Sequence, residues 1–194
     1  MRNASKTSDD ILACARSLIV IGGYNGFSYA DIAGVVGIRK ASIHHHFPAK
    51  ADLVRTLVAR YREEAREGMA AIESHRSDPV EQLRAYTGYW ETCIADATAP
   101  ICVCALLASE IPILPDEVVL EVRAHFRALS AWLATVLERG EQMGQIDLVA
   151  PPQAEAELFM ATVHGAMLSA RAYDKPEMFG AALAPLLGRL IVQN

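Results

Sequence analysis

Apolar residues recur at intervals of three and four along nearly the whole chain, and this spacing constrains the fold more than any other feature. Near the start of the chain one such stripe consists of Ile11, Leu12, Ala15, Leu18 and Ile19. A longer stripe of the same period lies between residues 118 and 137. This spacing indicates helices that bury one face, whereas half-buried strands alternate with a period of two. The sequence therefore predicts an all-α fold.

Glycine and proline residues divide this pattern into about nine helices. A glycine-rich turn closes the first helix, Ser28 caps a short second one that Gly37 ends, and Pro48 stops the third. The expected helices lie near residues 11–21, 29–36, 39–46, 50–73, 79–99, 101–111, 116–140, 152–173 and 176–192.

The composition excludes several classes of protein. With 52% hydrophobic and 21% charged residues, the chain is too apolar to be disordered. No apolar run reaches the roughly 18 residues that cross a bilayer, so no membrane partner is expected. Residues 1–10 are polar where a signal peptide is apolar, and four cysteines do not make a disulfide framework. We therefore expect a cytoplasmic protein.

Charge is distributed unevenly over the chain. The 18 basic and 23 acidic residues give a formal net charge of −5. Up to residue 60, however, eight basic residues stand against four acidic ones, which leaves +4 there and −9 in the remainder. This asymmetry suggests that only the front of the chain meets a polyanion. A chance imbalance on solvated helix faces is the alternative.

The segment from Ser28 to Lys50 has the proportions of a helix-turn-helix, with two short helices joined through Gly37 and Ile38. Its second helix begins with two cations and is anchored to the core by Ile43 and Phe47. The exposed face of that helix can reach base edges, and flanking polar groups can bind phosphates. The expected DNA contacts are Ser28, Arg39, Lys40, Ala41, Ser42, His44, His45 and Lys50. The alternative is an ordinary helical hairpin with a basic surface.

Three stretches, Gly26 to Ala33, Val36 to Ile38 and Ala41 to Leu53, resemble the TetR family of transcriptional regulators. The resemblance covers about a quarter of the chain. It implies a DNA-binding domain in residues 1–48 and a helical ligand-binding and dimerisation domain in residues 49–194. It also implies a homodimer that binds a palindromic operator on double-stranded DNA and that responds to a small-molecule effector.

Two residues depart from the family's usual pattern. His44 stands where the family usually has a tyrosine, and Arg39 stands where a small N-capping residue is common. A histidine can still donate a hydrogen bond to a phosphate, while an arginine adds charge and leaves the cap in doubt. We expect a repressor that is released by a mainly apolar or a thiol-reactive effector. A helical adaptor without DNA binding is the alternative function.

Large aromatic and soft side chains gather on the central helices, where the resemblance implies a ligand site. The residues expected to line this pocket are Tyr86, Tyr89, Trp90, Cys93, Cys104, Leu107, His125, Phe126, Phe159, Met160 and His164. Such a composition suits a mainly apolar or aromatic molecule with a few polar handles. Each of these residues is equally suited to a plain hydrophobic core.

The last two helices carry small and apolar residues that suit helix pairing. The expected dimer contacts are Ala161, Gly165, Leu168, Phe179, Leu183, Leu186, Leu187 and Leu190. Two such hairpins would form a four-helix bundle across a twofold axis. Alternatively, this face simply covers the core of a single chain.

No catalytic, metal or cofactor site is expected, because the chain lacks a phosphate loop and the sequence motifs of hydrolases and zinc enzymes. His44, His45 and His46 diverge on one helix and cannot close around one ion. Cys102 and Cys104 would project roughly 200° apart on a helix, which disfavours a shared metal or a disulfide. Either thiol could sense an electrophile, or both pack as small hydrophobic side chains.

Overall fold

The computed structural model describes residues 4–97 and 100–192. Over these ranges the chain forms nine α-helices and one short 3-10 helix, η1, without a β-strand, so the all-α prediction is confirmed. The elements are α1 (Ala4–Gly22), α2 (Tyr29–Val36), α3 (Lys40–His46), α4 (Lys50–His75), α5 (Pro79–Ala95), α6 (Val103–Ser109), η1 (Ile111–Ile113), α7 (Asp116–Gln142), α8 (Pro152–Tyr173) and α9 (Glu177–Leu190). None of the described helices combines the length and the apolar character that crossing a bilayer requires.

Contacts divide the chain into two compact units, and the first is made from two separate stretches. Unit 1 comprises the residues up to Glu63 together with Val103–His125. Unit 2 comprises Glu64–Cys102 together with the residues from Phe126 onward. Unit 1 therefore extends beyond residue 48, the predicted end of the first domain. It includes α6 because that helix packs against α1. The functional division into residues 1–48 and 49–194 stays a prediction.

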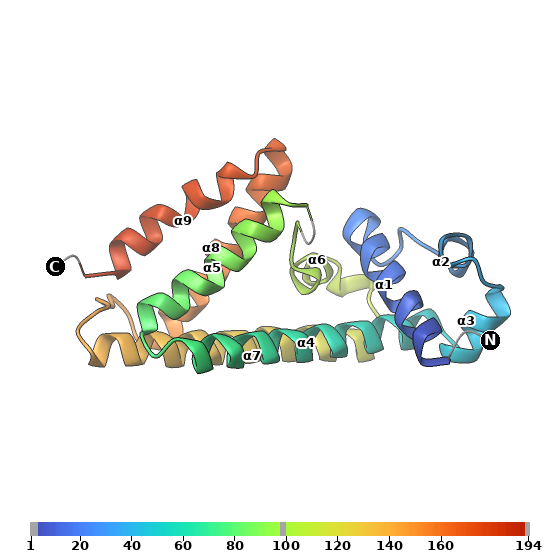
Figure 1. The fold of residues 1–194 in the computed structure, drawn as a ribbon, viewed down its shortest axis with the longest axis horizontal. Coiled ribbons are helices and arrows are strands. Elements are labelled where there is room, and N and C mark those ends of the chain that lie inside the picture. The colour runs from blue at the N-terminus through green and yellow to red at the C-terminus, as the bar shows by residue number, and fades with distance from the viewer. Residues whose placement is uncertain (1–3, 98–99, 193–194) are drawn as a thin grey trace. The chain divides into compact units, whose positions relative to one another are not determined.

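The first three helices of unit 1 pack around a small apolar core, with α2 against both α1 and α3 (Figure 1). Ile11, Ile32 and Ile43, one from each helix, have no exposed surface. Local signals set the ends of α2: Ser28 caps its start, and Gly37 ends it in the left-handed conformation with φ 72°. Both ends agree with the sequence prediction.

In unit 2, α8 packs along α9, and α5 contacts both of them (Figure 1). Leu83 of α5, Phe159 of α8 and Phe179 of α9 are each at most 1% exposed. The apolar faces of these three helices therefore supply much of the core of this unit.

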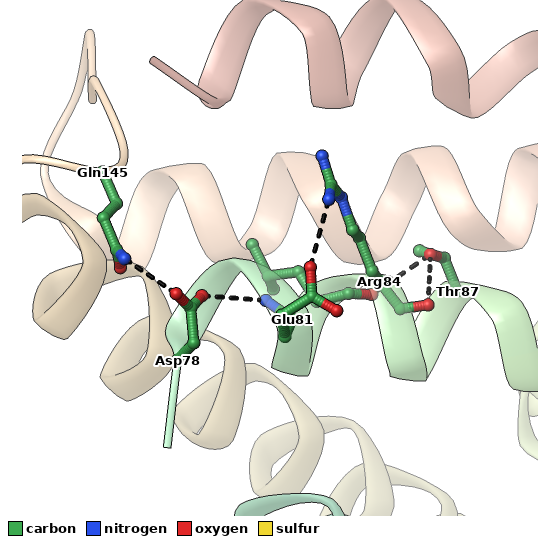
Figure 2. A network of polar contacts seen from close by, with 6 residues as sticks. Asp78, Glu81, Arg84, Thr87 and Gln145 are labelled. Atoms are coloured by element: carbon green, nitrogen blue, oxygen red, sulfur yellow. Dashed lines mark hydrogen bonds and ion pairs between the residues drawn. The ribbon is translucent and has the colours of Figure 1, made fainter. Parts of the chain in front are cut away.

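A polar network fixes the start of α5, as Figure 2 shows. Asp78 is the N-cap: one carboxylate oxygen accepts from the backbone N–H of Glu81 at 3.1 Å, and the other accepts from Nε2 of Gln145 at 2.8 Å. The bond from Glu81 is the largest cause that lowers the pKa of Asp78. Because α5 carries Tyr86, this cap also positions the aromatic residues described below.

Three helices differ clearly in extent from the sequence prediction. α5, predicted over 79–99, ends at Ala95, and residues 98 and 99 lie outside the described residues. α1 begins at Ala4, well before Ile11, and Asp9 in the added turns pairs with Arg60 at 2.6 Å. α6, predicted over 101–111, spans only Val103–Ser109, so Cys102 lies before its first residue. The angle expected for two cysteines on one helix therefore does not apply.

Gly140 has a packing role that the sequence prediction missed. The helix predicted over 116–140 ends at this glycine, yet Gly140 is buried inside α7, which continues to Gln142. A Cβ atom at Gly140 would lie 2.4 Å from Cδ1 of Ile146. The glycine therefore makes room for the Ile146 side chain.

Candidate DNA-binding surface and ligand-binding region

The short helix α3 exposes polar side chains on one side and buries apolar ones on the other. Arg39, Lys40 and His44 are exposed, whereas Ile43 is fully buried and Phe47 is 5% exposed. Of the remaining side chains expected on DNA, Ser28, Ala41 and His45 are exposed and Ser42 is half-buried. The predicted anchoring of α3 by Ile43 and Phe47 is confirmed.

The starts of α2 and α3 are capped differently. The Ser28 hydroxyl accepts from the backbone N–H of Ala30 at 3.1 Å and donates to the Asp31 carboxylate at 2.8 Å. That carboxylate also accepts from the backbone N–H of Ser28 at 2.7 Å, and these bonds lower its pKa. Arg39 occupies the N-cap of α3 without a side-chain cap. The first turn of α3 therefore keeps backbone donors that can meet an anion.

Tyr29 holds the end of α3. Its buried hydroxyl donates to the Phe47 carbonyl at 2.9 Å, and burial is the main reason that its pKa rises to about 12. The His44 ring lies edge-on to the Tyr29 ring at 4.8 Å, and its Nδ1 lies 3.2 Å from the Pro48 carbonyl oxygen. His44 is therefore anchored at one edge while the residue remains exposed.

Lys50 has an internal role that sequence reasoning missed. Its ammonium donates to the Phe27 carbonyl and lies 4.0 Å from the centre of the Phe27 ring and 5.0 Å from that of Tyr24. Burial of this group lowers the pKa of Lys50. Lys50 thus ties the start of α4 to the loop before α2, and a contact with phosphate stays a prediction.

Glu110 joins two segments of unit 1 that are distant in sequence. Its carboxylate accepts from the backbone N–H of Tyr24 at 2.8 Å, across 86 residues. Gly23 has φ 72°, and a Cβ atom there would lie 2.3 Å from the Glu110 carboxylate. The turn after α1 thus fits closely around the residue that follows α6. Nothing local in the sequence indicates this contact.

Unit 2 contains an aromatic cluster, which we define as Tyr86, Trp90, Phe126, Trp132, Phe159 and His164. The Tyr86 ring lies 5.7 Å from Trp132 and 6.5 Å from Phe159, and the Phe126 ring lies 5.3 Å from His164. The buried atoms Trp132 Nε1 and His164 Nε2 have no hydrogen-bond partner in the described structure. Burial raises the pKa of Tyr86, and a side-chain hydrogen bond from Trp90 acts in the opposite direction. The cluster therefore combines apolar packing with unused polar atoms.

Not every residue expected in the pocket belongs to this cluster. Cys93 and Met160 are also buried in unit 2. Tyr89 is 53% exposed on α5, so it does not line a buried site within the chain. Cys104, Leu107 and His125 belong to unit 1. Trp132 of α7 packs on Tyr86 and belongs to the cluster.

The expected dimer contacts separate into exposed and buried residues. Ala161, Gly165 and Leu168 form an exposed stripe on α8, with Leu168 53% exposed, and Leu187 is half-buried. The other four residues fill the core of unit 2 and are at most 8% exposed: Phe179, Leu183, Leu186 and Leu190. For these four the structure corrects the expectation of an open face, because the amphipathic face of α9 is covered within the same chain.

The cysteines are free thiols, and Cys93, Cys102 and Cys104 are buried. Among the described residues, no group of three or more histidine, cysteine or acidic side chains is arranged to hold a metal ion.

Comparison with known proteins identifies the family. The family described as "Bacterial regulatory proteins, tetR family" matches residues 11–57, and "Tetracyclin repressor-like, C-terminal domain" matches residues 79–186. A TetR-family transcriptional regulator from Agrobacterium tumefaciens is 65% identical, with a TM-score of 0.96 over 98% of this chain and 100% of that one. A TetR regulator from Legionella pneumophila is 27% identical, with a TM-score of 0.80 over 89% of this chain and 91% of that one.

A further relative matches only the N-terminal part. The HTH-type transcriptional regulator CymR from Pseudomonas putida is 35% identical over 51 residues, which are 26% of this chain. The matched segment spans 25% of the length of CymR. The family models, in contrast, match both the helix-turn-helix and most of the C-terminal helices. The chain therefore belongs to the TetR family of transcriptional regulators, with a DNA-binding helix-turn-helix followed by a ligand-binding domain.

Proposed function

We propose that this protein is a cytoplasmic repressor that binds a palindromic operator as a homodimer and leaves it when a small, mainly apolar effector binds. The observation that carries the proposal is the surface of α3. Arg39, Lys40 and His44 are exposed there, while Ile43 and Phe47 hold the helix to the core. A short helix presented in this way fits the major groove.

Two contributions to DNA binding are separable on this surface. Arg39 is the N-cap of α3 and Lys40 is its first residue, where the helix dipole adds to their positive charge. In this proposal Lys40 contacts base edges, whereas the polar residues around it contact phosphates. Sequence preference therefore belongs mainly to Lys40 and its neighbours on the exposed face.

Pairing of two chains supplies the second recognition helix that a palindromic operator requires. The exposed stripe of Ala161, Gly165 and Leu168 on α8 lets a second helix approach closely. A dimer contacts two half-sites about 34 Å apart. A single small DNA-binding domain seldom achieves comparable sequence selectivity.

The structure favours an apolar effector over a thiol-reactive one. Cys102 and Cys104 are 1% and 0% exposed, so a reagent reaches them only after local opening. The effector must bind the DNA-releasing conformation more tightly, since a ligand with equal affinity for both conformations shifts nothing. Both α4 and α7 contribute residues to unit 1 and unit 2, so they are continuous routes for such a change.

The test is binding to a duplex from the region upstream of the protein's own gene, measured by fluorescence anisotropy at several salt concentrations. Lys40→Ala should weaken operator binding by about 1–3 kcal/mol and relax its sequence preference. Lys175→Ala, an exposed lysine between α8 and α9, serves as the matched control. Unchanged affinity and preference in Lys40→Ala would contradict the assigned register of α3. If the wild-type protein does not bind DNA even at low salt, the adaptor is the better description.

A further inference from the structure

We infer that operator binding is coupled to the uptake of a proton at His44, whose imidazole binds a DNA phosphate through Nε2 only when the ring is charged. The inference rests on the proposed function in taking the exposed side of α3 as the face that meets DNA. It adds a regulatory input, the pH, and names the side chain that responds to it.

The contact at Nδ1 fixes which nitrogen of His44 carries the proton in the neutral ring. Nδ1 lies 3.2 Å from the Pro48 carbonyl oxygen, and a backbone carbonyl can only accept a hydrogen bond. The neutral ring that makes this bond therefore has its proton on Nδ1 and a lone pair on Nε2. The Tyr29 ring packs against the same imidazole at 4.8 Å. Turning the imidazole over would break the bond to Pro48 and disturb the contact with Tyr29.

The other ring nitrogen, Nε2, is the atom of His44 that is left for a ligand. The residue is exposed, and among the described residues its ring forms a hydrogen bond only with the Pro48 carbonyl. Lys40 is four residues earlier on α3 and is exposed as well. Because residues four apart share one face of a helix, His44 lies on the same side of α3 as Lys40.

A phosphate group of DNA offers oxygen atoms that accept hydrogen bonds. The lone pair on Nε2 of the neutral ring would face such an oxygen and repel it. Protonation gives His44 a second N–H donor and a positive charge, and charge-assisted hydrogen bonds are about twice as strong as neutral ones. The complex therefore favours the charged ring, and His44 takes up a proton on binding wherever the free ring is neutral.

The other ionisable groups around His44 keep one charge state over the pH range in which imidazoles titrate. Tyr29 of α2 is neutral, since burial raises its pKa to about 12. Asp52 of α4 acts through its charge on Tyr29, and the Lys50 ammonium is bonded in the loop before α2. Lys40 precedes His44 on α3 itself. Carboxylates and ammonium groups ordinarily stay charged between about pH 6 and pH 8, whereas an imidazole changes its charge there.

His45 provides an internal comparison. It follows His44 on α3 and is exposed, and its ring lies edge-on to His46 with 5.6 Å between the centroids. Among the described residues the His45 ring makes no hydrogen bond. A neutral imidazole without such a bond can carry its proton on either nitrogen, so it can donate to a phosphate without taking up a second one. We therefore expect proton uptake at His44 and not at His45.

The experiment measures binding of the full-length protein to the duplex from the region upstream of its own gene, by fluorescence anisotropy at constant salt. From about pH 6 to about pH 8 the affinity of the wild type should fall by about 10- to 50-fold. This is the change expected when each chain of a dimer takes up one proton and each charged ring favours the complex about tenfold. Calorimetric titration in two buffers of different ionisation enthalpy counts the protons directly.

His44→Gln is the test variant, because an amide N–H donates to phosphate at every pH and does not titrate. Its affinity should stay constant over this range, weaker than that of the wild type at pH 6 and equal or tighter at pH 8. His45→Gln is the matched control and should keep the pH dependence of the wild type. Calorimetry should show proton uptake reduced in His44→Gln and unchanged in His45→Gln.

The inference is overturned if the affinity of the wild type is constant over this range, if His44→Gln keeps the pH dependence, or if His45→Gln loses it. Nitrogen-15 NMR of the free protein tests the premise without DNA: the neutral His44 ring should carry its proton on Nδ1, and a proton on Nε2 would contradict the inference. All these outcomes leave the proposed function standing. If the wild type binds no DNA at any pH, the proposed function fails and the inference fails with it.

Discussion

Tyr29 joins the core of unit 1 to the end of α3 through one hydroxyl. The bond from its Oη to the Phe47 carbonyl is 2.9 Å long and buried, and the His44 ring packs against the same side chain. At the scale of the residue, the position of the DNA-facing helix therefore depends on a single neutral donor as well as on apolar anchors.

Tyr29→Phe removes the hydroxyl, so the Phe47 carbonyl loses the hydrogen bond that Tyr29 donates to it. The free energy of unfolding should fall by about 1–2 kcal/mol, which urea denaturation measures. Operator affinity should fall as well, because the end of α3 becomes less well held. An unchanged urea midpoint would show that water replaces the hydroxyl without loss.

The raised pKa of Tyr29 predicts how the free energy of unfolding changes at alkaline pH. Burial raises the pKa of Tyr29 to about 12 from its ordinary value of 10.0, so the unfolded chain loses this proton first. The stabilisation from Tyr29 is therefore complete below pH 10 and decreases as the pH rises towards 12. In Tyr29→Phe this part of the pH dependence should disappear from urea titrations at alkaline pH.

At the scale of the element, the turn after α1 and the residue after α6 fit one another closely. Gly23 adopts φ 72° beside the Glu110 carboxylate, which accepts the Tyr24 N–H. Gly34, in contrast, lies within α2, and a Cβ atom there would meet open space. The two glycines make a matched pair for substitution.

Gly23→Ala should lower the free energy of unfolding by about 1–3 kcal/mol, because alanine is strained at positive φ and its Cβ displaces Glu110. Gly34→Ala should raise the free energy of unfolding by up to about 1 kcal/mol, since alanine favours a helix more than glycine does. Thermal and urea unfolding measure both variants. Equal shifts in the two would contradict the role given to Glu110.

Glu155 connects the start of α8 to the end of α9. One carboxylate oxygen accepts from the backbone N–H groups of Val149 and Ala150, both at 3.2 Å, and the other accepts from Arg189 at 2.6 Å. The bond from Arg189 is the largest cause that lowers the pKa of Glu155. The residue is 3% exposed, whereas the Arg189 side chain is 35% exposed.

Glu155→Gln keeps the shape of the side chain and removes its charge. The expected loss is about 2 kcal/mol in the free energy of unfolding, less than for a fully buried pair because Arg189 is partly solvated. In the wild type this contribution is present above the ordinary pKa of 4.5 and is lost as the pH falls through the lowered folded value. Glu138→Gln, on the exposed side of α7, is the control. A stability difference between wild type and Glu155→Gln that is the same at pH 7 and pH 3 would refute this assignment.

The ends of the helices could be predicted from the sequence where a local signal marks them. Ser28 and Gly37 delimit α2 because capping and positive φ are properties of single residues. The partners of Lys50 and Glu110 lie 23 and 86 residues away, and such contacts leave no local pattern. The apolar face of α9 was visible in the sequence, but periodicity does not say whether the same chain or a second one covers it.

At the scale of the whole molecule, the exposed stripe on α8 is the surface on which the proposed pairing of two chains depends. Leu168, at the end of the stripe, is 53% exposed, and Leu158, which precedes the stripe on the same helix, is 49% exposed. Ala161 and Gly165 lie between these two leucines. Exposed leucines flanking small residues suit a closely packed helix pair.

Leu168→Glu should convert the dimer into a monomer, because a charge would be buried in the interface while the core of the single chain stays intact. Native mass spectrometry reports the mass directly. Leu120→Glu, on α7 and 61% exposed, is the control and should remain dimeric. A dimeric Leu168→Glu protein would place the interface elsewhere.

Unit 1 consists of two stretches of chain, and this matters for any attempt to transfer its helix-turn-helix to another regulator. A graft cut after residue 48 leaves behind Val103–His125, and with it the carboxylate of Glu110 that holds the Tyr24 N–H. The recipient regulator would then have to offer its own acceptor to that turn. Chimeras that carry both stretches should keep their operator preference, whereas those that carry only the first should need a compensating acidic residue in the host.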